Sequence, residues 1–359
     1  MSQVAMFFTI DRISRVVFWL CVSGVISTLA SVFGLDCWAV FLTSWCLTAG
    51  TYLVLSSLRV STDGKAVLVS GCDSGFGHAA ALHLHKKGFR VFAGCLQADT
   101  NGEGARKLKD IDPERLHVLQ LDVSKQDDIN QALKFVSGTL KDNEVLWGVI
   151  NNAGIAIYGA VEWVSMASFK RVCDVNLFGT VALTKACLPL IRKAKGRVVN
   201  VSSARGRMTS PLGTTYEATK YAIEGFSDGL RKEMKAWGVD VCIIEPGNYV
   251  AGTSVYTEKV VDAVSESLWR DMDDGIKEDY GGKETFDRVH AIQKAICTSG
   301  FKDLTPVVAA MDDSLTQRYP HERYQPMGIY LYIITFISQH FPEWVSDYIS
   351  LEILMKKGW

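Results

Sequence analysis

The sequence has no excess of charge of either sign and no basic stretch along its 359 residues. Lys and Arg number 38, Asp and Glu number 39, and the two kinds are mixed along the chain. A protein that binds nucleic acid needs clustered basic residues to neutralise the phosphate backbone. We therefore expect no nucleic-acid partner.

Paired cysteines and clustered histidines are missing as well. The nine cysteines are scattered without a CxxC spacing, and the closest histidines, His83 and His85, would point to different faces of a helix. We expect no metal site, and we interpret the cysteines as reduced, mostly buried thiols.

Charged residues are scarcest near the N-terminus. Between residues 16 and 58 only Asp36 carries a charge. As a helix this stretch would be about 64 Å long, roughly twice the thickness of a bilayer core. We predict a transmembrane helical hairpin with helices at about 16–35 and 37–58. Two buried core helices are the alternative, which apolar residues on every face make less favourable.

Basic residues flank this hairpin at both ends, with Arg12 and Arg15 before it and Arg59 after it. The positive-inside rule places both ends, and the domain that follows, on the cytosolic side. The apolar runs are too long for a cleaved signal peptide or a mitochondrial presequence. We expect an endoplasmic reticulum membrane, with a mitochondrial membrane as the alternative.

From Lys65 onward, short β-branched runs alternate with helical periods, a pattern typical of a doubly wound parallel sheet. The expected strands are 66–70, 90–94, 117–121, 146–150, 197–201 and 239–244. We predict an α/β fold of Rossmann type behind the hairpin. The expected parts are a membrane anchor at 1–64, a catalytic domain at 65–328 and an apolar C-terminal segment at 329–359.

The first strand leads directly into a glycine-rich turn, SGCDSGFG, and then into a helical run. Gly71 permits the tight turn, Gly75 lets backbone N–H groups approach a pyrophosphate, and Gly77 allows close packing of the helix. A purely structural glycine turn explains this segment equally well when it is taken alone.

Four more motifs follow in order. They are LDV (121–123), NNAG (151–154), the pair Ser202 and Ser203, and YEATK (216–220). Together with PG at 246–247, they make the chain resemble the short-chain dehydrogenase/reductase family over roughly residues 65–345. Within the family, the chain is most similar to the branch with D-β-hydroxybutyrate dehydrogenase, type 2 hydroxysteroid dehydrogenases and retinol dehydrogenases. The segments that indicate this branch are CDSGFG, GRM, EPGN and RYQPM.

The resemblance implies two sets of site residues. The catalytic set is Asn176, Ser203, Tyr216 and Lys220. The cofactor-binding set is Gly71, Asp73, Ser74, Gly75, Phe76, Gly77, Asp122, Asn151, Ala153, Gly154, Tyr216, Lys220, Pro246 and Gly247.

Physical chemistry supports the catalytic set independently. Tyr216 and Lys220 are four residues apart and share one face of a helix. The pKa of a free tyrosine is near 10, and lowering it by ~2 to 3 units needs about 3 to 4 kcal/mol. One ammonium at ~5 Å supplies roughly 3 kcal/mol at an effective dielectric near 20, and an oxidised nicotinamide adds a second positive charge. Tyr216 can then accept the hydroxyl proton.

The other catalytic residues are placed by strand alternation and by the resemblance. Ser203 ends a strand, where its hydroxyl can hold the substrate oxygen. Ser202 would point to the opposite side, so we interpret it as structural. The family's asparagine, here Asn176, ties Lys220 to a water relay.

Cofactor choice depends on the residues after the second strand, where NADP enzymes need a basic side chain. The segment GCLQAD (94–99) has none, and Ser74 is also uncharged. We predict NAD. The usual acidic ribose partner is missing too, because Gly94 and Cys95 occupy its place. Asp122 would lie near the adenine by resemblance, although capping of the next helix explains it nearly as well.

Two features after the PG motif depart from the family. The threonine that commonly touches the nicotinamide carboxamide is Ala251 here, and Thr253 could replace it if the loop bulges. The stretch 254–302 is expected to form a helical lid over the substrate. Its apolar residues Tyr256, Leu268, Trp269 and Met272 fit a lid or an ordinary core equally well.

We therefore predict an NAD-dependent oxidoreductase that interconverts a secondary alcohol and a ketone. The expected substrate is a short 3-hydroxy acid such as 3-hydroxybutyrate, with Arg205 as a candidate partner for its carboxylate. The alternatives are a hydroxysteroid or retinol dehydrogenase, or an inactive membrane-bound nucleotide-binding protein. The expected partners are a small alcohol or ketone and membrane lipid. The sequence leaves open whether the chain forms a homo-oligomer.

Overall fold

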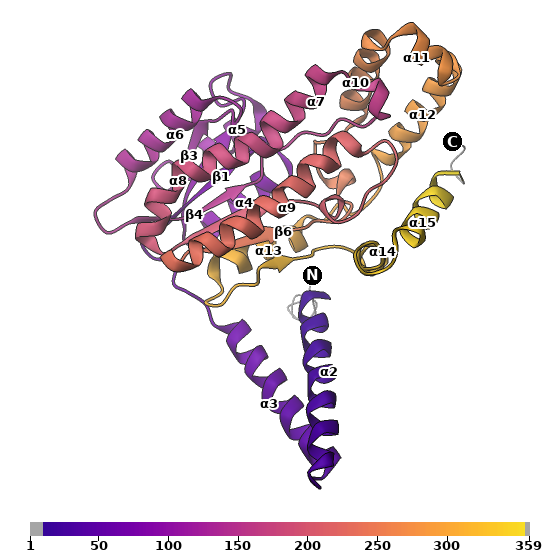
Figure 1. Cartoon of the computed structure of the whole chain (residues 1–359). Helices are drawn as coiled ribbons and strands as arrows, with labels where there is room; N and C mark the ends of the chain where they lie inside the picture. Colours follow the sequence, from indigo (N-terminus) through magenta and orange to yellow (C-terminus); the bar gives the residue numbers. More distant parts are fainter. Residues whose placement is uncertain (1–9, 356–359) are drawn as a thin grey trace.

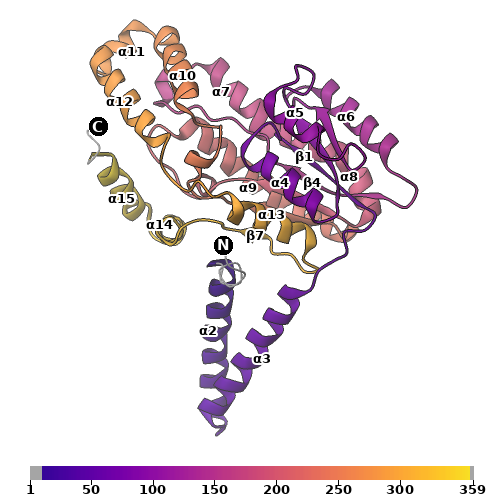
Figure 2. The same cartoon turned by 180° about the vertical axis from the view of Figure 1, so that it is seen from behind.

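A hairpin of two helices projects from an α/β domain in the computed structural model, which describes residues 10–355 (Figures 1 and 2). Helix α2 covers Ile10–Val32 and α3 covers Cys37–Ser57. Gly34, with φ +77°, permits the turn between them, and Asp36 caps α3 by accepting from Ala39 N at 2.7 Å. Both helices are long and apolar enough to cross a membrane. The predicted hairpin is confirmed, although its first helix begins earlier than expected.

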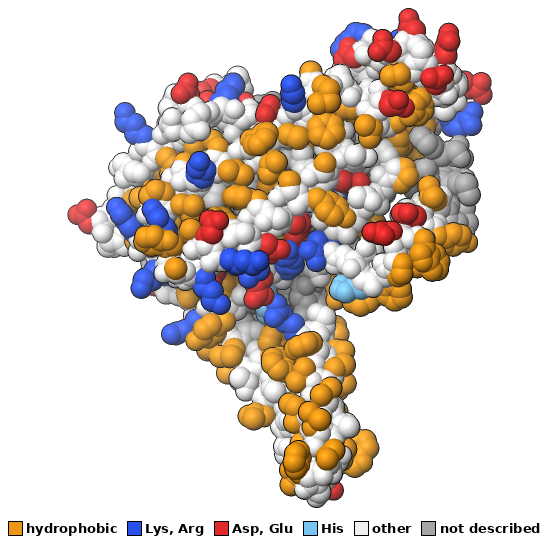
Figure 3. Space-filling view, in the orientation of Figure 1, with side chains coloured by type: hydrophobic (Ala, Val, Ile, Leu, Met, Phe, Trp, Pro, Cys, Tyr) orange, Lys and Arg blue, Asp and Glu red, His pale blue; other side chains and the backbone are white. Residues whose placement is uncertain are grey.

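Small residues bring the two hairpin helices together. Ser23 and Ser27 are buried between them, and Ser27 Oγ donates to Cys37 O at 2.8 Å. Most other side chains of the hairpin are apolar and exposed, as the orange surface of Figure 3 shows. That exposure fits contact with lipid rather than with a protein core.

Charged and polar side chains tie the root of the hairpin to the domain. Asp313 pairs with Arg59 at 2.9 Å and with Arg12 at 3.7 Å, so one carboxylate meets both ends of the hairpin. Arg15 pairs with Glu322 at 2.9 Å. These contacts hold the domain at the end of the hairpin opposite its turn.

The domain contains a parallel sheet of seven strands in the order β3-β2-β1-β4-β5-β6-β7. The strands are β1 Lys65–Ser70, β2 Arg90–Cys95, β3 Leu116–Gln120, β4 Val145–Asn151, β5 Arg197–Val201, β6 Asp240–Ile244 and β7 Arg323–Tyr324. The six predicted strands are confirmed to within one residue at each end. Strand β7 was not predicted, because two residues carry no periodicity.

Helices cover both faces of the sheet, which is why its strands are apolar throughout (Figure 1). Val67 and Val69 of β1 pack with α4, α5 and α13, whereas Ala66 and Leu68 pack with α6, α8 and α9. These helices are α4 Gly75–Lys86, α5 Glu103–Lys109, α13 Thr305–Thr316, α6 Gln126–Thr139, α8 Thr180–Ala194 and α9 Thr214–Met234. The stretch 166–194 is also apolar enough to span a membrane, but α8 within it packs on the sheet.

A smaller helical unit extends from the domain. It consists of α10 Glu258–Asp271, α11 Asp274–Asp279 and α12 Gly282–Ile296, packed on η1 Val161–Trp163 and α7 Met166–Cys173. Leu268, Trp269 and Met272 lie in the core of this unit. They serve as ordinary core residues, whereas Tyr256 packs against the ring of Tyr158.

The C-terminal segment forms α14 Ile329–His340 and α15 Glu343–Met355. Their exposed side chains include Ile329, Tyr330, Ile333, Trp344 and Tyr348. Figures 1 and 2 show α14 on the side of the domain from which the hairpin leaves.

Candidate functional site

The predicted catalytic residues gather at the carboxyl ends of the central strands. Ser203 is the second residue after β5, and Tyr216 and Lys220 lie on the first turns of α9, which packs against the short helix η3 Ala204–Gly206. Strand order reverses between β1 and β4, and open α/β sheets bind ligands at such a reversal.

Tyr216 is half-buried, and the Ser203 hydroxyl lies near its phenol. Burial raises the pKa of Tyr216 to about 12, while the nearby Ser203 hydroxyl and Arg205 guanidinium oppose that increase. A tyrosine with this pKa is an acid in the free protein, and it needs further positive charge to act as a base at neutral pH.

Lys220 lies one helical turn from Tyr216, with its ammonium 5.5 Å from the centroid of the phenol ring. Lys220 Nζ donates to Val201 O at 2.9 Å, which fixes the side chain against the end of β5. Burial lowers the pKa of Lys220 to about 8, and Glu224 opposes this decrease. The ammonium is therefore charged at neutral pH.

Asn176 belongs to a π-helical turn, Asp174–Gly179, an irregularity that is frequent at functional sites. Its Oδ1 accepts from Ile155 N at 2.9 Å, and its Nδ2 donates to Ile155 O at 2.9 Å and to Thr219 Oγ1 at 3.0 Å. The Asn176 side chain thus holds the loop after NNAG beside α9. Its amide does not contact Lys220 directly, so any link between these residues needs a mediator.

Ser202 has the structural role that strand alternation predicts. It is buried, and its hydroxyl lies 3.4 Å from Lys220 O, beneath α9. Ser203 is thereby the serine that faces Tyr216.

A charged pair beside the catalytic tyrosine was missed by the sequence reasoning. Glu217 is 1% exposed and accepts from Arg205 Nη1 at 3.0 Å. Ser210 N also donates to Glu217 Oε2 at 3.1 Å. Burial raises the pKa of Glu217, whereas Arg205 and Ser210 lower it. Arg205 does lie near Tyr216, as expected, but it already has a carboxylate partner.

Aromatic side chains form a wall next to Tyr216. The Tyr158 ring lies 5.7 Å from the Tyr216 ring and 5.0 Å from the Tyr256 ring, both between centroids. Burial raises the pKa of both Tyr158 and Tyr256, so both phenols stay neutral. An aromatic residue four positions after NNAG was the available signal for Tyr158.

The glycine-rich turn has the geometry that the sequence predicts. Gly71 and Gly75 have φ values of +72° and +59°. A side chain on Gly71 would approach Ala153 Cα to 2.9 Å, and one on Gly77 would overlap the Gly71 carbonyl. Within residues 10–355, the Ser74 hydroxyl makes no capping bond to α4, so the first amides of this helix are left to bind an anion.

Thr253 lies against this turn. Its side chain is 3.5 Å from the position of a Cβ on Gly75, after the short helix η5 Val250–Gly252. The Thr253 side chain therefore contacts the glycine-rich turn. Phe76 packs edge-on against Tyr249, with ring centroids 5.5 Å apart, and closes the same corner.

Two predicted cofactor residues have other contacts. The buried Nδ2 of Asn151 donates to Asn200 Oδ1 at 2.7 Å and to Thr184 Oγ1 at 2.8 Å, so the Asn151 side chain joins β4 to β5 and α8. Asp122 accepts from Ser124 N at 3.0 Å and from Ser124 Oγ at 2.6 Å. These bonds lie in the turn before α6, whose N-cap is Lys125, so the Asp122 side chain does not cap that helix.

The remaining predicted cofactor residues lie close to the glycine-rich turn or to Ser203. Ala153 N donates to Ser70 Oγ at 3.1 Å, which joins NNAG to the end of β1. A Cβ on Gly154 would lie 3.3 Å from Asn176 Oδ1. Pro246 O accepts from Ala204 N at 3.0 Å, and Gly247 packs against Met327.

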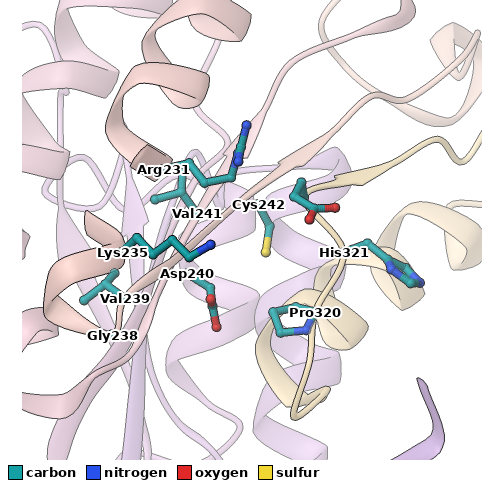
Figure 4. Close-up of a pocket in the computed structure, with 10 residues that line it drawn as sticks. Arg231, Lys235, Gly238, Val239, Asp240, Val241, Cys242, Pro320 and His321 are labelled. Carbon is teal, nitrogen blue, oxygen red and sulfur yellow. The ribbon is translucent and has the colours of Figure 1, made fainter. Parts of the chain in front are cut away.

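A separate pocket of about 140 Å³ lies at the opposite end of the sheet (Figure 4). Arg231, Lys235 and Asp240 line it together with Pro320 and His321. Asp240 begins β6, so this pocket is at the amino ends of the strands, away from Tyr216. Among residues 10–355, no three His, Cys, Asp or Glu side chains are grouped closely enough to hold a metal.

Comparisons with known proteins identify a family and several relatives. Residues 65–260 match the family model described as short chain dehydrogenase. The mitochondrial D-beta-hydroxybutyrate dehydrogenase of Rattus norvegicus is 45% identical over 292 residues, covering 81% of this chain and 85% of the relative. Retinol dehydrogenase 7 of Mus musculus is 40% identical over 260 residues, covering 72% of this chain and 79% of the relative.

A solved structure supports the fold. A short-chain dehydrogenase from Streptomyces avermitilis superposes with a TM-score of 0.61 at 23% identity, covering 82% of this chain and 98% of its own. At that identity the likeness concerns the fold alone.

Proposed function

The chain belongs to the short-chain dehydrogenase family and is an oxidoreductase, and on this premise we propose that it interconverts a secondary alcohol and a ketone with NAD and Tyr216. The observation that carries the proposal is the grouping of Tyr216, Ser203 and Lys220 beside a glycine-rich turn whose helix amides are open to an anion. NAD supplies the hydride acceptor when bound.

The residues present fit this cofactor. The turn from Gly71 to Gly77 leaves helix amides for a pyrophosphate, and Thr253 lies above it at the nicotinamide end. Asp122 and Ala153 would lie on the adenine side by resemblance. The β2–α5 loop has no basic side chain for an additional phosphate.

In alcohol oxidation, Ser203 holds the substrate hydroxyl and Tyr216 accepts its proton as the carbon–hydrogen bond breaks. The ammonium of Lys220, together with Arg205, stabilises the phenolate form of Tyr216 that accepts this proton. In ketone reduction Tyr216 returns the proton. Asn176 holds the loop that carries Ile155 and so keeps the wall of the site in place.

We propose a short 3-hydroxy acid as the substrate. Arg205 lies close enough to Tyr216 to lower its pKa, and its side chain is 36% exposed, so N–H groups not used by Glu217 can face a ligand. The D-beta-hydroxybutyrate dehydrogenase relatives support the same class. A hydroxysteroid or retinol is the second candidate, because Glu217 already neutralises Arg205 and because Tyr158 and Tyr256 form an aromatic wall.

The experiment follows NADH formation by the detergent-solubilised full chain with 3-hydroxybutyrate, a hydroxysteroid and retinol. If Arg205 binds the carboxylate, Arg205→Leu raises the KM for the hydroxy acid roughly ten-fold or more, since a charge-assisted hydrogen bond contributes about 1.5 to 3 kcal/mol. Arg207→Leu is the matched control, because Arg207 bonds Gln339 on α14. Equal KM values for wild type and Arg205→Leu would contradict a short hydroxy acid as the substrate bound by Arg205. A hydroxysteroid or retinol would then be the remaining candidate.

We further propose that the hairpin within residues 1–64 anchors the domain on the cytosolic face of the endoplasmic reticulum, with a mitochondrial membrane as the alternative. Arg12, Arg15 and Arg59 at its two ends support this orientation. Residues 65–328 would be the catalytic domain, with 254–302 as its lid and 329–359 as an apolar surface segment.

A further inference from the structure

The acid expected at the end of β2 is absent from that strand, yet the structure places a carboxylate there from another segment. Gly94 and Cys95 end β2, and neither carries a charge. Asp73, in the glycine-rich turn after β1, reaches across to the first two residues beyond β2. A carboxylate thus occupies the end of β2 without belonging to it.

The contacts of this carboxylate are specific. Leu96 N donates to Asp73 Oδ2 at 2.8 Å, and Gln97 N donates to Asp73 Oδ1 at 3.0 Å. Two successive amides that point at one anion form the kind of backbone concavity that binds phosphate in other proteins. In this chain the protein's own carboxylate fills that concavity.

Packing fixes Asp73 in this position. A Cβ on Gly104 would overlap the Asp73 carbonyl, so the first turn of α5 rests directly on the Asp73 backbone. The lysines of α5 are engaged elsewhere: Lys109 Nζ donates to Ala98 O at 3.3 Å, and Lys107 pairs with Glu103 at 2.7 Å. Neither lysine contacts the Asp73 carboxylate.

We propose that Asp73 makes the site select NAD over NADP. In dinucleotide-binding folds the adenosine ribose lies at the end of the second strand, where an acid accepts from its 2′-hydroxyl and a base would be needed for a 2′-phosphate. Asp73 occupies the amide pair that a 2′-phosphate would otherwise use, and its charge repels that phosphate. This inference rests on the proposed function, because it requires a dinucleotide at the glycine-rich turn.

The test is a binding titration, which does not depend on turnover. NADH and NADPH are titrated separately into the detergent-solubilised full chain, and the nicotinamide fluorescence gives a Kd for each. Asp73→Ala removes the charge and frees both amides, whereas Asp73→Asn keeps the size and one acceptor. Asp99→Asn is the matched control, because Asp99 is an exposed acid in the loop after β2 that Asp73 contacts.

We expect wild type to bind NADH more tightly than NADPH, and Asp73→Ala to shift the ratio of the two Kd values toward NADPH by at least ten-fold. Asp73→Asn should shift the ratio less, and Asp99→Asn should leave it unchanged. If Asp73→Ala weakens both dinucleotides equally, Asp73 only supports the loop and the inference is wrong.

Two results separate this inference from the proposed function. Wild-type protein that binds neither dinucleotide contradicts both. Protein that binds NADH and oxidises an alcohol, but whose Kd ratio is the same in wild type and in both Asp73 variants, contradicts the selection role alone. A melting curve of each variant without dinucleotide identifies any that is misfolded. If Asp73→Ala is misfolded, the Kd ratio of Asp73→Asn tests the selection role instead.

Discussion

Replacing Lys220 with methionine is expected to stabilise the fold at neutral pH while it abolishes activity. Lys220 is 5% exposed, and burial lowers its pKa from 10.5 to about 8. A shift of that size corresponds to roughly 3 kcal/mol of destabilisation for holding the ammonium in the core. Methionine fills a similar space without a charge, but it leaves Val201 O without the donor it has at 2.9 Å, which costs about 1 to 3 kcal/mol. The expected net gain is roughly 1 kcal/mol.

The direction of the Lys220 pKa shift determines how the stability of wild type changes with pH. The folded state of wild type releases the Lys220 proton at a lower pH than the unfolded state does. The destabilisation is therefore complete below about pH 8, decreases between about pH 8 and pH 10.5, and is absent above that range. The advantage of Lys220→Met should be largest at neutral pH and should disappear in alkali.

Thermal unfolding of the detergent-solubilised chain, followed by tryptophan fluorescence without dinucleotide, measures this effect. At neutral pH the Tm of Lys220→Met should exceed that of wild type by about 2 to 4 °C, and the difference should shrink as pH rises toward about 10. Lys232→Met, an exposed lysine on the same helix, should leave Tm unchanged. A lower Tm for Lys220→Met at neutral pH, or a difference that grows with pH, would refute the reasoning.

Two further predictions concern the glycine-rich turn and the anchor. Gly77→Ala should lower Tm and abolish NADH binding, because the added Cβ would overlap the Gly71 carbonyl. Gly138→Ala on α6 is the control: its Cβ meets nothing within 4 Å, so it should be neutral or slightly stabilising. If Gly77→Ala binds NADH as tightly as wild type, this prediction is wrong. Deleting residues 1–60 should move the chain from the membrane pellet to the soluble fraction, although the exposed apolar residues of α14 can retain some of it. A truncated chain as resistant to high salt and carbonate as the full chain would show that the hairpin is not the main anchor.

Most of the fold follows from local patterns in the sequence. The six strands of β-branched residues are buried on both faces, so their composition alone distinguishes them from the amphipathic helices. The hairpin is also predicted from local sequence, because two long helices that are apolar on every face favour contact with lipid over packing in a protein core. Strand β7 could not be predicted, since its two residues pair only because α13 returns the chain to the edge of β6.

The site could be predicted only in part, because some of its contacts join residues that are far apart in the sequence. The spacing of Tyr216 and Lys220 is local to one helix, so the sequence predicts their proximity. The partners of Asp73 and Arg205 are not local: Leu96 and Gln97 lie more than twenty residues from Asp73, and Glu217 looks like an exposed helical residue until the loop after β5 folds over it. Contacts of this kind depend on the tertiary structure.

The central claim is that Tyr216 carries the proton in an NAD-dependent oxidation, and removing a single oxygen tests it. NADH formation by wild type and by Tyr216→Phe is compared on the alcohol that wild type oxidises fastest, and NADH binding is titrated in parallel. The account predicts that Tyr216→Phe loses turnover while its Kd for NADH stays within about two-fold of wild type, because only the ionisable group is removed. Substantial NADH formation by Tyr216→Phe, or none by wild type on any alcohol in the panel, would contradict it.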